Sequence, residues 1–464
     1  MKRFSINNTA LKAAVLFLVL IITAALIGCD KREVQTGEVD QNLTAEELDI
    51  RGKITLTITD DISEEDEAAP RSIISAFTKK YPNTQVILEK GKRSSFATRI
   101  SSGDIGDVFW VDPIDCNDYQ QNHNALMPLD SYLKPLNIDL GDIYTGALEC
   151  GKVAGRLYMA PRAIAEQLLI YNETIMESAG IDFDNTRAYS WEDFKDLCRR
   201  MTVIENGTVK QAGASLKIWW EPVWPMFFQG FGGKWIDNKQ HKVTITESVE
   251  VMQGINEIVA GVQEGWLFPE DMAGQINTWK YGFGDGSANM AQVCFKTFNG
   301  MSWLFSYGRM YDTLQLDWDL CPFPAFPTHT VSTGATGYVV YNRTKNPNTA
   351  AAFALFFLTP EGQKAYQSQT GGNVPVLKSL ADEDFWKGVD TEWNDKNYSA
   401  FVAYPDMTRP CNTVLFAPIE IADIFSNENM TNAFVRIING TADAQTVFGQ
   451  MERKANEKWA TIAG

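Results

Sequence analysis

The segment with the clearest chemical potential is a run of aromatic and acidic side chains near the middle of the chain. Trp219, Trp220, Glu221 and Trp224 fall within six residues, and Pro222 interrupts the run. Indole rings suit the C–H faces of a sugar, and a carboxylate can hydrogen-bond to its hydroxyl groups. The run is therefore a candidate cleft-lining loop for a carbohydrate, although the same indoles could instead form a core cluster.

A second candidate lies at the end of a predicted strand. Residues 107–111 (DVFWV) form an apolar stretch of strand length, and Trp110 and Asp112 stand at its carboxyl end. Ligands of open α/β sheets bind outside the carboxyl ends of the strands. Both side chains are thus candidates for ligand contact, and Asp112 could alternatively cap the helix that follows.

The surrounding pattern alternates between strands and helices. Strands are predicted at 53–59, 85–89 and 107–111, and the spacing of Ile73, Phe77 and Tyr81 predicts a helix that Pro82 ends. Strand, helix and strand at this spacing indicate a parallel sheet covered by helices, the α/β class. About 410 residues of such sequence exceed a single core, so we expect two lobes.

The composition of the chain argues against some classes of binding partner. The chain has 58 acidic and 41 basic residues, a net charge of −17, which argues against nucleic acid because phosphate binding depends on Lys and Arg. The three histidines are scattered, and no CxxC pair occurs, so neither a metal site nor a cofactor is expected. Six cysteines follow Cys29, and we expect them to be buried thiols, of which one pair could form a disulfide.

The N-terminus has the features of an export signal. Basic residues lead into an apolar run over 13–27, which is short for a membrane span and closes on Leu26-Ile27-Gly28-Cys29. This resembles the bacterial lipobox, so residues 1–28 are expected to be a signal peptide and Cys29 a lipidated residue. An uncleaved membrane anchor is the alternative. The polar, acidic segment 29–51 is expected to be a flexible tether.

Several stretches, taken in order, resemble the family 1 extracellular solute-binding proteins, the maltose-binding-protein-like class. They are 75–82 (SAFTKKYP), 102–112 (SGDIGDVFWVD), 125–133 (ALMPLDSYL), 155–161 (GRLYMAP) with 169–172 (LIYN) and 179–180, 231–237 (FGGKWID), 317–324 (DWDLCPFP), and motifs from 346 to 375. Each is weak alone, and together they cover about residues 53–380.

The resemblance implies a two-lobed flytrap fold. Each lobe would be a mostly parallel sheet flanked by helices, with the ligand cleft between the lobes. Lobe 1 is expected over 52–162 plus 326–372, and lobe 2 over 163–325 plus 373–464. Such a protein is a monomer and not an enzyme. It captures a mono- or oligosaccharide and delivers it to the permease and ATPase subunits of an ABC importer, and the lipid holds it on the outer face of the cytoplasmic membrane, in the periplasm or at the cell surface.

The resemblance also suggests further ligand contacts. Gly300-Met-Ser-Trp303 is similar to the family's Gly-x-Trp, in which the indole stacks on the ligand, although here one extra residue intervenes. Arg162 and Glu166 lie at a crossing between lobes and could bind hydroxyls or pair with each other. The remaining candidates are Ser95 in a contact loop, Thr336 in a glycine-rich stretch that could also be a tight turn, and Arg409.

Three other functions stay open at this point. The same fold could bind a peptide, a polyamine or an organic anion, and the last would need clustered cations. A secreted glycoside-active enzyme would need two carboxylates at a set separation, such as Asp112 and Glu221. A solute sensor that signals to a membrane kinase would have the same sequence features.

Overall fold

The computed structural model describes residues 44, 48–276, 280–285, 287–388, 393–404, 408–409 and 417–463. The predicted signal peptide and Cys29 lie outside this part of the chain, as does most of the predicted tether. Within the described part, no helix combines the length and apolar character needed to cross a bilayer.

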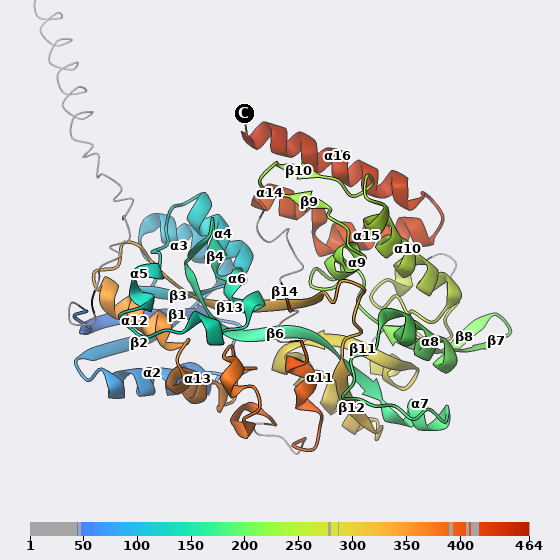
Figure 1. Ribbon diagram of the computed structural model, residues 1–464, viewed down its shortest axis with the longest axis horizontal. Helices are drawn as coiled ribbons and strands as arrows, with labels where there is room; N and C mark the ends of the chain where they lie inside the picture. The colour runs from blue at the N-terminus through green and yellow to red at the C-terminus, as the bar shows by residue number, and fades with distance from the viewer. Residues whose placement is uncertain are drawn as a thin grey trace, which may run out of the picture. The chain divides into compact units, whose positions relative to one another are not determined.

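A mixed sheet of ten strands runs through the described chain (Figure 1). Its order is β2 (Thr84–Gly91), β1 (Gly52–Thr59), β3 (Val108–Val111), β13 (Val331–Val340), β6 (Met159–Asn172), β11 (Val293–Asn299), β8 (Thr208–Ser215) and β7 (Val203–Glu205), with β12 (Trp318–Pro322) beside β6 and β14 (Thr408–Arg409) beside β13. The pairs β1–β2, β1–β3 and β8–β11 are parallel. The predicted two-lobed α/β fold is confirmed, and the first three strands lie within two residues of their predicted bounds.

Strand β6 joins the two halves of the sheet. Its first part, up to Glu166, pairs with β13, and its second part, from Gln167 onward, pairs with β11 and β12. The strand is 14 residues long and almost wholly buried, and its sequence is apolar except for Arg162, Glu166, Gln167 and Asn172. The change of partner between Glu166 and Gln167 makes this the point at which one half of the chain passes into the other.

Two clusters of buried side chains flank this crossing. The first surrounds β1, β2 and β3 and includes helices α2 (Ala68–Lys80), α12 (Pro347–Phe356) and α13 (Pro360–Gln367). It also holds the buried face of α11 (Gly300–Thr313) and buried residues from Val374 to Trp386 and from Tyr398 to Phe401. From Tyr404 onward, the described buried residues of the C-terminal part of the chain belong to the second cluster. The expected residue boundaries of the lobes stay a prediction.

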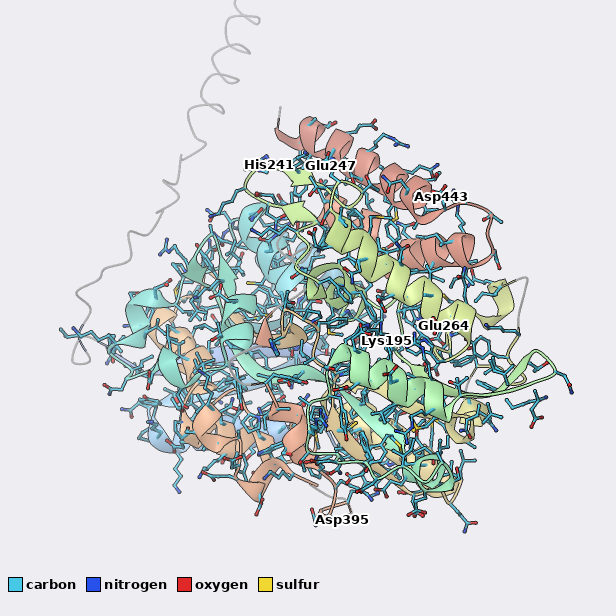
Figure 2. The ribbon with its side chains drawn as sticks, turned by 45° about the vertical axis from the view of Figure 1, so that its right-hand side comes forward. Lys195, His241, Glu247, Glu264, Asp395 and Asp443 are labelled. Atoms are coloured by element: carbon cyan, nitrogen blue, oxygen red, sulfur yellow. The ribbon has the colours of Figure 1, made fainter. Side chains whose placement is uncertain are left out.

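Five helices supply much of the second cluster. They are α8 (Trp191–Met201), α9 (Trp224–Gly230), α10 (Val249–Glu264), α15 (Asn427–Ile438) and α16 (Ala444–Ala463). The Ser190 hydroxyl caps α8 by accepting from the Asp193 N–H at 3.1 Å, as its sequence predicts. Ion pairs of 2.9 Å, Lys195–Glu257 and Arg199–Glu264, join α8 to α10; Figure 2 labels Lys195 and Glu264 on the two helices.

The cysteines of the described chain are buried thiols. Cys116, Cys150, Cys198, Cys294 and Cys321 are all free, and Cys411 lies outside the described residues. These thiols contribute to the cores as small apolar side chains.

Candidate ligand-binding pocket

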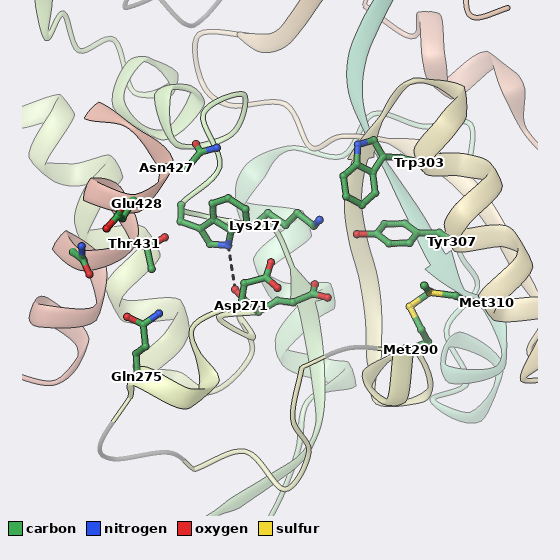
Figure 3. Close-up of a pocket in the computed structure, with 13 residues that line it drawn as sticks. Lys217, Asp271, Gln275, Met290, Trp303, Tyr307, Met310, Asn427, Glu428 and Thr431 are labelled. Atoms are coloured by element: carbon green, nitrogen blue, oxygen red, sulfur yellow. Dashed lines mark hydrogen bonds between the residues drawn. The ribbon is translucent and has the colours of Figure 1, made fainter. Parts of the chain in front are cut away.

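A cavity of about 720 Å³ opens beside α11 (Figure 3). Helix α11 supplies Trp303, Tyr307 and Met310 to the lining, and helix α15 supplies Asn427, Glu428, Thr431 and Asn432. The chain between β8 and β11 supplies the other lining residues, which are Lys217, Trp219, Glu270, Asp271, Gln275 and Met290. Tyr307 belongs to the first core cluster, whereas Trp219 packs against the second. All of these lining residues come after the crossing in β6, and the cavity has the size of a small-molecule site.

A sharp turn positions the aromatic wall. Gly300 adopts a left-handed φ of 69° between β11 and α11, and a Cβ there would lie 3.3 Å from the Asn373 amide nitrogen. The Asn373 side-chain oxygen also accepts a hydrogen bond from the Met301 N–H at 3.2 Å, at the start of the helix. Trp303 and Tyr307 then fall one turn apart, with ring centroids separated by 5.7 Å. Trp303 keeps 38% of its surface exposed, so its ring is available to a ligand.

One lining residue, Glu270, belongs to a buried ion pair. The Lys296 ammonium lies 2.7 Å from the Glu270 carboxylate, and the two side chains are only 1% and 10% exposed. Ser215 donates a 2.6 Å hydrogen bond to the same carboxylate, and Lys296 donates one of 2.8 Å to Asn289. Burial alone would raise the pKa of Glu270, but the Lys296 charge and the hydrogen bonds from Lys296 and Ser215 hold that pKa below its ordinary value. Beside it, burial and the Glu270 charge raise the pKa of Asp271.

The tryptophan-rich run divides between the pocket and the core. Trp219 lines the pocket, and its indole N–H donates to the Glu270 backbone oxygen at 3.2 Å, dashed in Figure 3. The Trp220 ring lies 6.1 Å from that of Trp303. Trp224, in contrast, is fully buried in the second core and packs against Phe228, Trp235 and Phe425. Core packing, the alternative stated for the whole run, describes Trp224 fully, whereas Trp219 and Trp220 are only partly buried against the same cluster.

Glu221 lies beside the pocket and not in its lining. Its backbone N–H donates to the Asn427 side-chain oxygen at 2.8 Å, but one carboxylate oxygen is buried without a hydrogen-bond partner among the described residues. Burial, with a smaller contribution from the Asp112 charge, raises the pKa of Glu221 to about 8. Glu221 and Asp112 are therefore close enough to interact, although they come from different halves of the protein.

The first-half candidates form a separate cluster around Arg93. Asp112 caps helix α4 (Pro113–Gln121) by accepting from the Asp115 N–H at 2.9 Å, and it also pairs with the Arg93 guanidinium. That guanidinium lies 5.3 Å from the centre of the Trp110 ring. Ser95, in the short helix η2 (Arg93–Ser95), donates to the Lys92 backbone oxygen at 2.6 Å. The capping role proposed for Asp112 is present, and none of these three candidates lines the described pocket.

The hinge candidates also take structural partners. Arg162 donates to the Thr336 hydroxyl at 3.1 Å and to the Tyr366 hydroxyl at 2.5 Å, so it does not pair with Glu166. The backbone of Arg409 lies in β14 opposite Ser332, and its side chain is outside the described part of the structure.

Glu166 is an unusual buried acid. It is 0% exposed, and neither carboxylate oxygen has a hydrogen-bond partner among the described residues. Burial raises the pKa of Glu166 well above its ordinary value of 4.5, and the nearby backbone N–H of Tyr404 opposes this only in part. Burial thus favours the neutral form of Glu166 in the folded protein.

A pH-dependent stability follows from Glu166. Above pH 4.5 the folded protein binds more protons here than the unfolded chain, so the free energy of unfolding should fall as pH rises, by up to about 1.4 kcal/mol per pH unit. Glu221 adds a fall of the same sign up to about pH 8. We expect Glu166→Gln to be more stable than wild type at pH 8, with the difference shrinking at pH 5, in urea titrations. Glu177→Gln, at an exposed site, is the control; equal pH slopes in all three proteins would contradict the expectation.

Sequence reasoning missed the polar half of the pocket. Lys217 lies two positions before Trp219, and this closeness to the tryptophan run is a signal that could have made it a candidate. Glu270, Asp271 and the α15 residues carry no local signal, because ordinary polar residues on a loop and on an amphipathic helix are indistinguishable from solvated surface.

Comparisons with known proteins agree with this architecture. A sequence model described as bacterial extracellular solute-binding protein matches residues 60–293. Similar solved structures include the sugar-binding protein MalE from Xanthomonas citri, with a TM-score of 0.68, 14% identity, and coverage of 89% of this chain and 98% of that one. An ABC substrate-binding protein from Listeria monocytogenes in complex with cycloalternan has a TM-score of 0.62 at 18% identity, covering 88% and 99%. UgpB from Mycobacterium tuberculosis, in complex with glycerophosphocholine, has 0.63 at 19%, covering 89% and 100%. No match was found among curated proteins.

Proposed function

This chain belongs to the bacterial extracellular solute-binding protein family, and from that premise we propose that it captures a carbohydrate in the pocket beside α11 and delivers it to an ABC importer. One observation carries the choice of a carbohydrate. Trp219, Trp303 and Tyr307 offer aromatic rings to a cavity whose lining also carries carboxylates, amides and a hydroxyl. A sugar presents the complementary surface, because its C–H faces suit aromatic rings and its hydroxyls suit planar polar groups.

The charge of the lining disfavours one class of solute. Three carboxylates, of Glu270, Asp271 and Glu428, line the cavity, and Lys217 is the one cation among the described lining residues. An organic anion would meet net repulsion, since anion sites gather Arg, Lys or helix N-termini. A neutral polyol would meet donors and acceptors without that cost. UgpB, which has this fold, was solved with glycerophosphocholine, so a solute other than a simple sugar is the second candidate.

The delivery mechanism rests on the crossing strand. Strand β6 changes partner between Glu166 and Gln167, so small backbone changes there could rotate one half against the other. A solute that contacts both halves would bind the closed arrangement better and thereby increase its population. The importer then recognises the closed protein, and no covalent bond is made or broken. The Leu26–Cys29 lipobox supports lipid anchoring at Cys29 outside the cytoplasmic membrane.

Thermal unfolding of the purified protein against a solute panel tests the proposal. The panel comprises neutral mono-, di- and trisaccharides, choline, putrescine, a dipeptide and citrate. A ligand at 100 times its dissociation constant adds about 2.7 kcal/mol, which should raise the melting temperature by roughly 2 °C or more. We expect a saturable rise with a neutral saccharide and none with citrate. A rise confined to amines or peptides would overturn the carbohydrate assignment, and chromatographic evidence of cleaved sugar would overturn a purely binding role.

A further inference from the structure

The Lys217 side chain occupies an aromatic cage, which we define as the rings of Trp220, Trp303 and Tyr307. Its ammonium lies 4.0 Å from the Trp303 ring centre, 5.7 Å from that of Trp220 and 5.8 Å from that of Tyr307. Figure 3 shows Lys217 reaching across the pocket toward Trp303 and Tyr307. Each ring is within the range of a cation–π contact, so three aromatic faces converge on one positive charge.

The backbone holds the ammonium in this place. Lys217 has a left-handed φ of 46°, a conformation that residues with side chains seldom adopt and that is found preferentially at functional sites. Its carbonyl accepts a 2.7 Å hydrogen bond from the Trp220 N–H, so one tight turn sets both the cation and one ring of the cage. With 9% of its surface exposed, Lys217 is nearly withdrawn from solvent.

The cage provides an environment for a cation but no direct ion pair. Among the described residues, no carboxylate oxygen lies within 4.0 Å of the Lys217 ammonium in the way that Glu270 pairs with Lys296. Burial lowers the pKa of Lys217, and the charges of Glu270 and Asp271 oppose this only in part. The rings and these carboxylates would therefore attract any small cation that took the place of Lys217.

We propose that Lys217 is a specificity-determining residue, which fills the aromatic cage with an internal ammonium and so excludes cationic solutes from the pocket. A solute amine would meet both a like charge and an occupied cage, whereas a sugar hydroxyl can accept a hydrogen bond from the ammonium. This inference rests on the proposal that the pocket is the solute site. It deepens that proposal by explaining why a pocket rich in carboxylates and aromatic rings would hold a neutral ligand.

Emptying the cage tests the inference. Lys217→Gly suits the left-handed backbone, and Lys217→Asn, which also tolerates it, serves as the second variant. The probes are choline and its neutral carbon analogue 3,3-dimethyl-1-butanol, titrated by calorimetry into the full chain at constant ionic strength. We expect choline to bind either variant at least about tenfold more tightly than wild type, and the neutral analogue to show no such gain. Adding Trp303→Ala to Lys217→Gly should remove the gain.

Two results would overturn the inference. One is no gain for choline in either variant when circular dichroism shows native structure; the other is an equal gain for the neutral analogue, which would indicate a merely apolar cavity. These outcomes are independent of the sugar panel. If the variants gained choline binding but wild type bound no saccharide, the inference about the cage would stand and the carbohydrate proposal would fall. If wild type bound a saccharide but the variants gained no choline binding, the carbohydrate proposal would stand and the inference about the cage would fall.

Discussion

Replacing Trp303 by alanine is expected to weaken saccharide binding by roughly 10- to 100-fold, or about 1.4–2.8 kcal/mol. The ring is the most exposed aromatic surface of the pocket wall, and its loss removes both stacking area and one face of the cage around Lys217. Because the ring is 38% exposed and outside the core, the free energy of unfolding should change by only about 1 kcal/mol or less. Calorimetric titration with the tightest saccharide of the panel measures the first effect, and urea unfolding measures the second.

Leu314→Ala is the matched control for that experiment. Leu314 ends the same helix and is similarly exposed, at 42%, but it does not line the pocket. It should leave the affinity unchanged. If both variants lost affinity equally, the loss would come from a general disturbance of α11. If Trp303→Ala bound as tightly as wild type, the saccharide would lie elsewhere.

Replacing Lys296 by methionine is expected to destabilise the protein by about 3–5 kcal/mol. Methionine matches the length of the lysine stem but leaves the Glu270 carboxylate buried without its 2.7 Å partner. Removing one member of a buried ion pair costs far more than the pair contributes, because an uncompensated charge remains in the interior. Urea unfolding at neutral pH measures the loss, and the double variant Lys296→Met/Glu270→Gln should regain part of it.

The control uses an exposed ion pair whose charged atoms lie the same distance apart. Lys364 and Glu383 also lie 2.7 Å apart, with side chains 49% and 43% exposed. Lys364→Met should cost no more than about 1 kcal/mol, because water already screens that pair. If Lys296→Met were no more destabilising than Lys364→Met, water would reach the Glu270 carboxylate and the ion pair would not be structural.

The sequence alone predicted much of the fold because the relevant signals are local. Strand 107–111 and the helix capped by Ser190 depend on neighbours within a few positions, and the structure places both where they were expected. The ordered motifs from 75 to 375 predicted the family in the same way. Trp303 was singled out because Gly300-Met-Ser-Trp303 is similar to the family's Gly-x-Trp; the structure places it in the pocket wall, and its contact with a solute stays a prediction.

What the tertiary structure decided is which side of each element faces the pocket. Within one run of six residues, Trp219 reaches the cavity and Trp224 enters the core, and no local pattern distinguishes them. The partner that orients Trp219 is Glu270, 51 positions away, and the rings around Lys217 come partly from α11, more than 80 positions away. Periodicity and capping are set by contacts within a turn or a strand, whereas a pocket is set by packing between distant elements. The sequence therefore determined the elements and the family, and only the folded chain determined which side chains share a site.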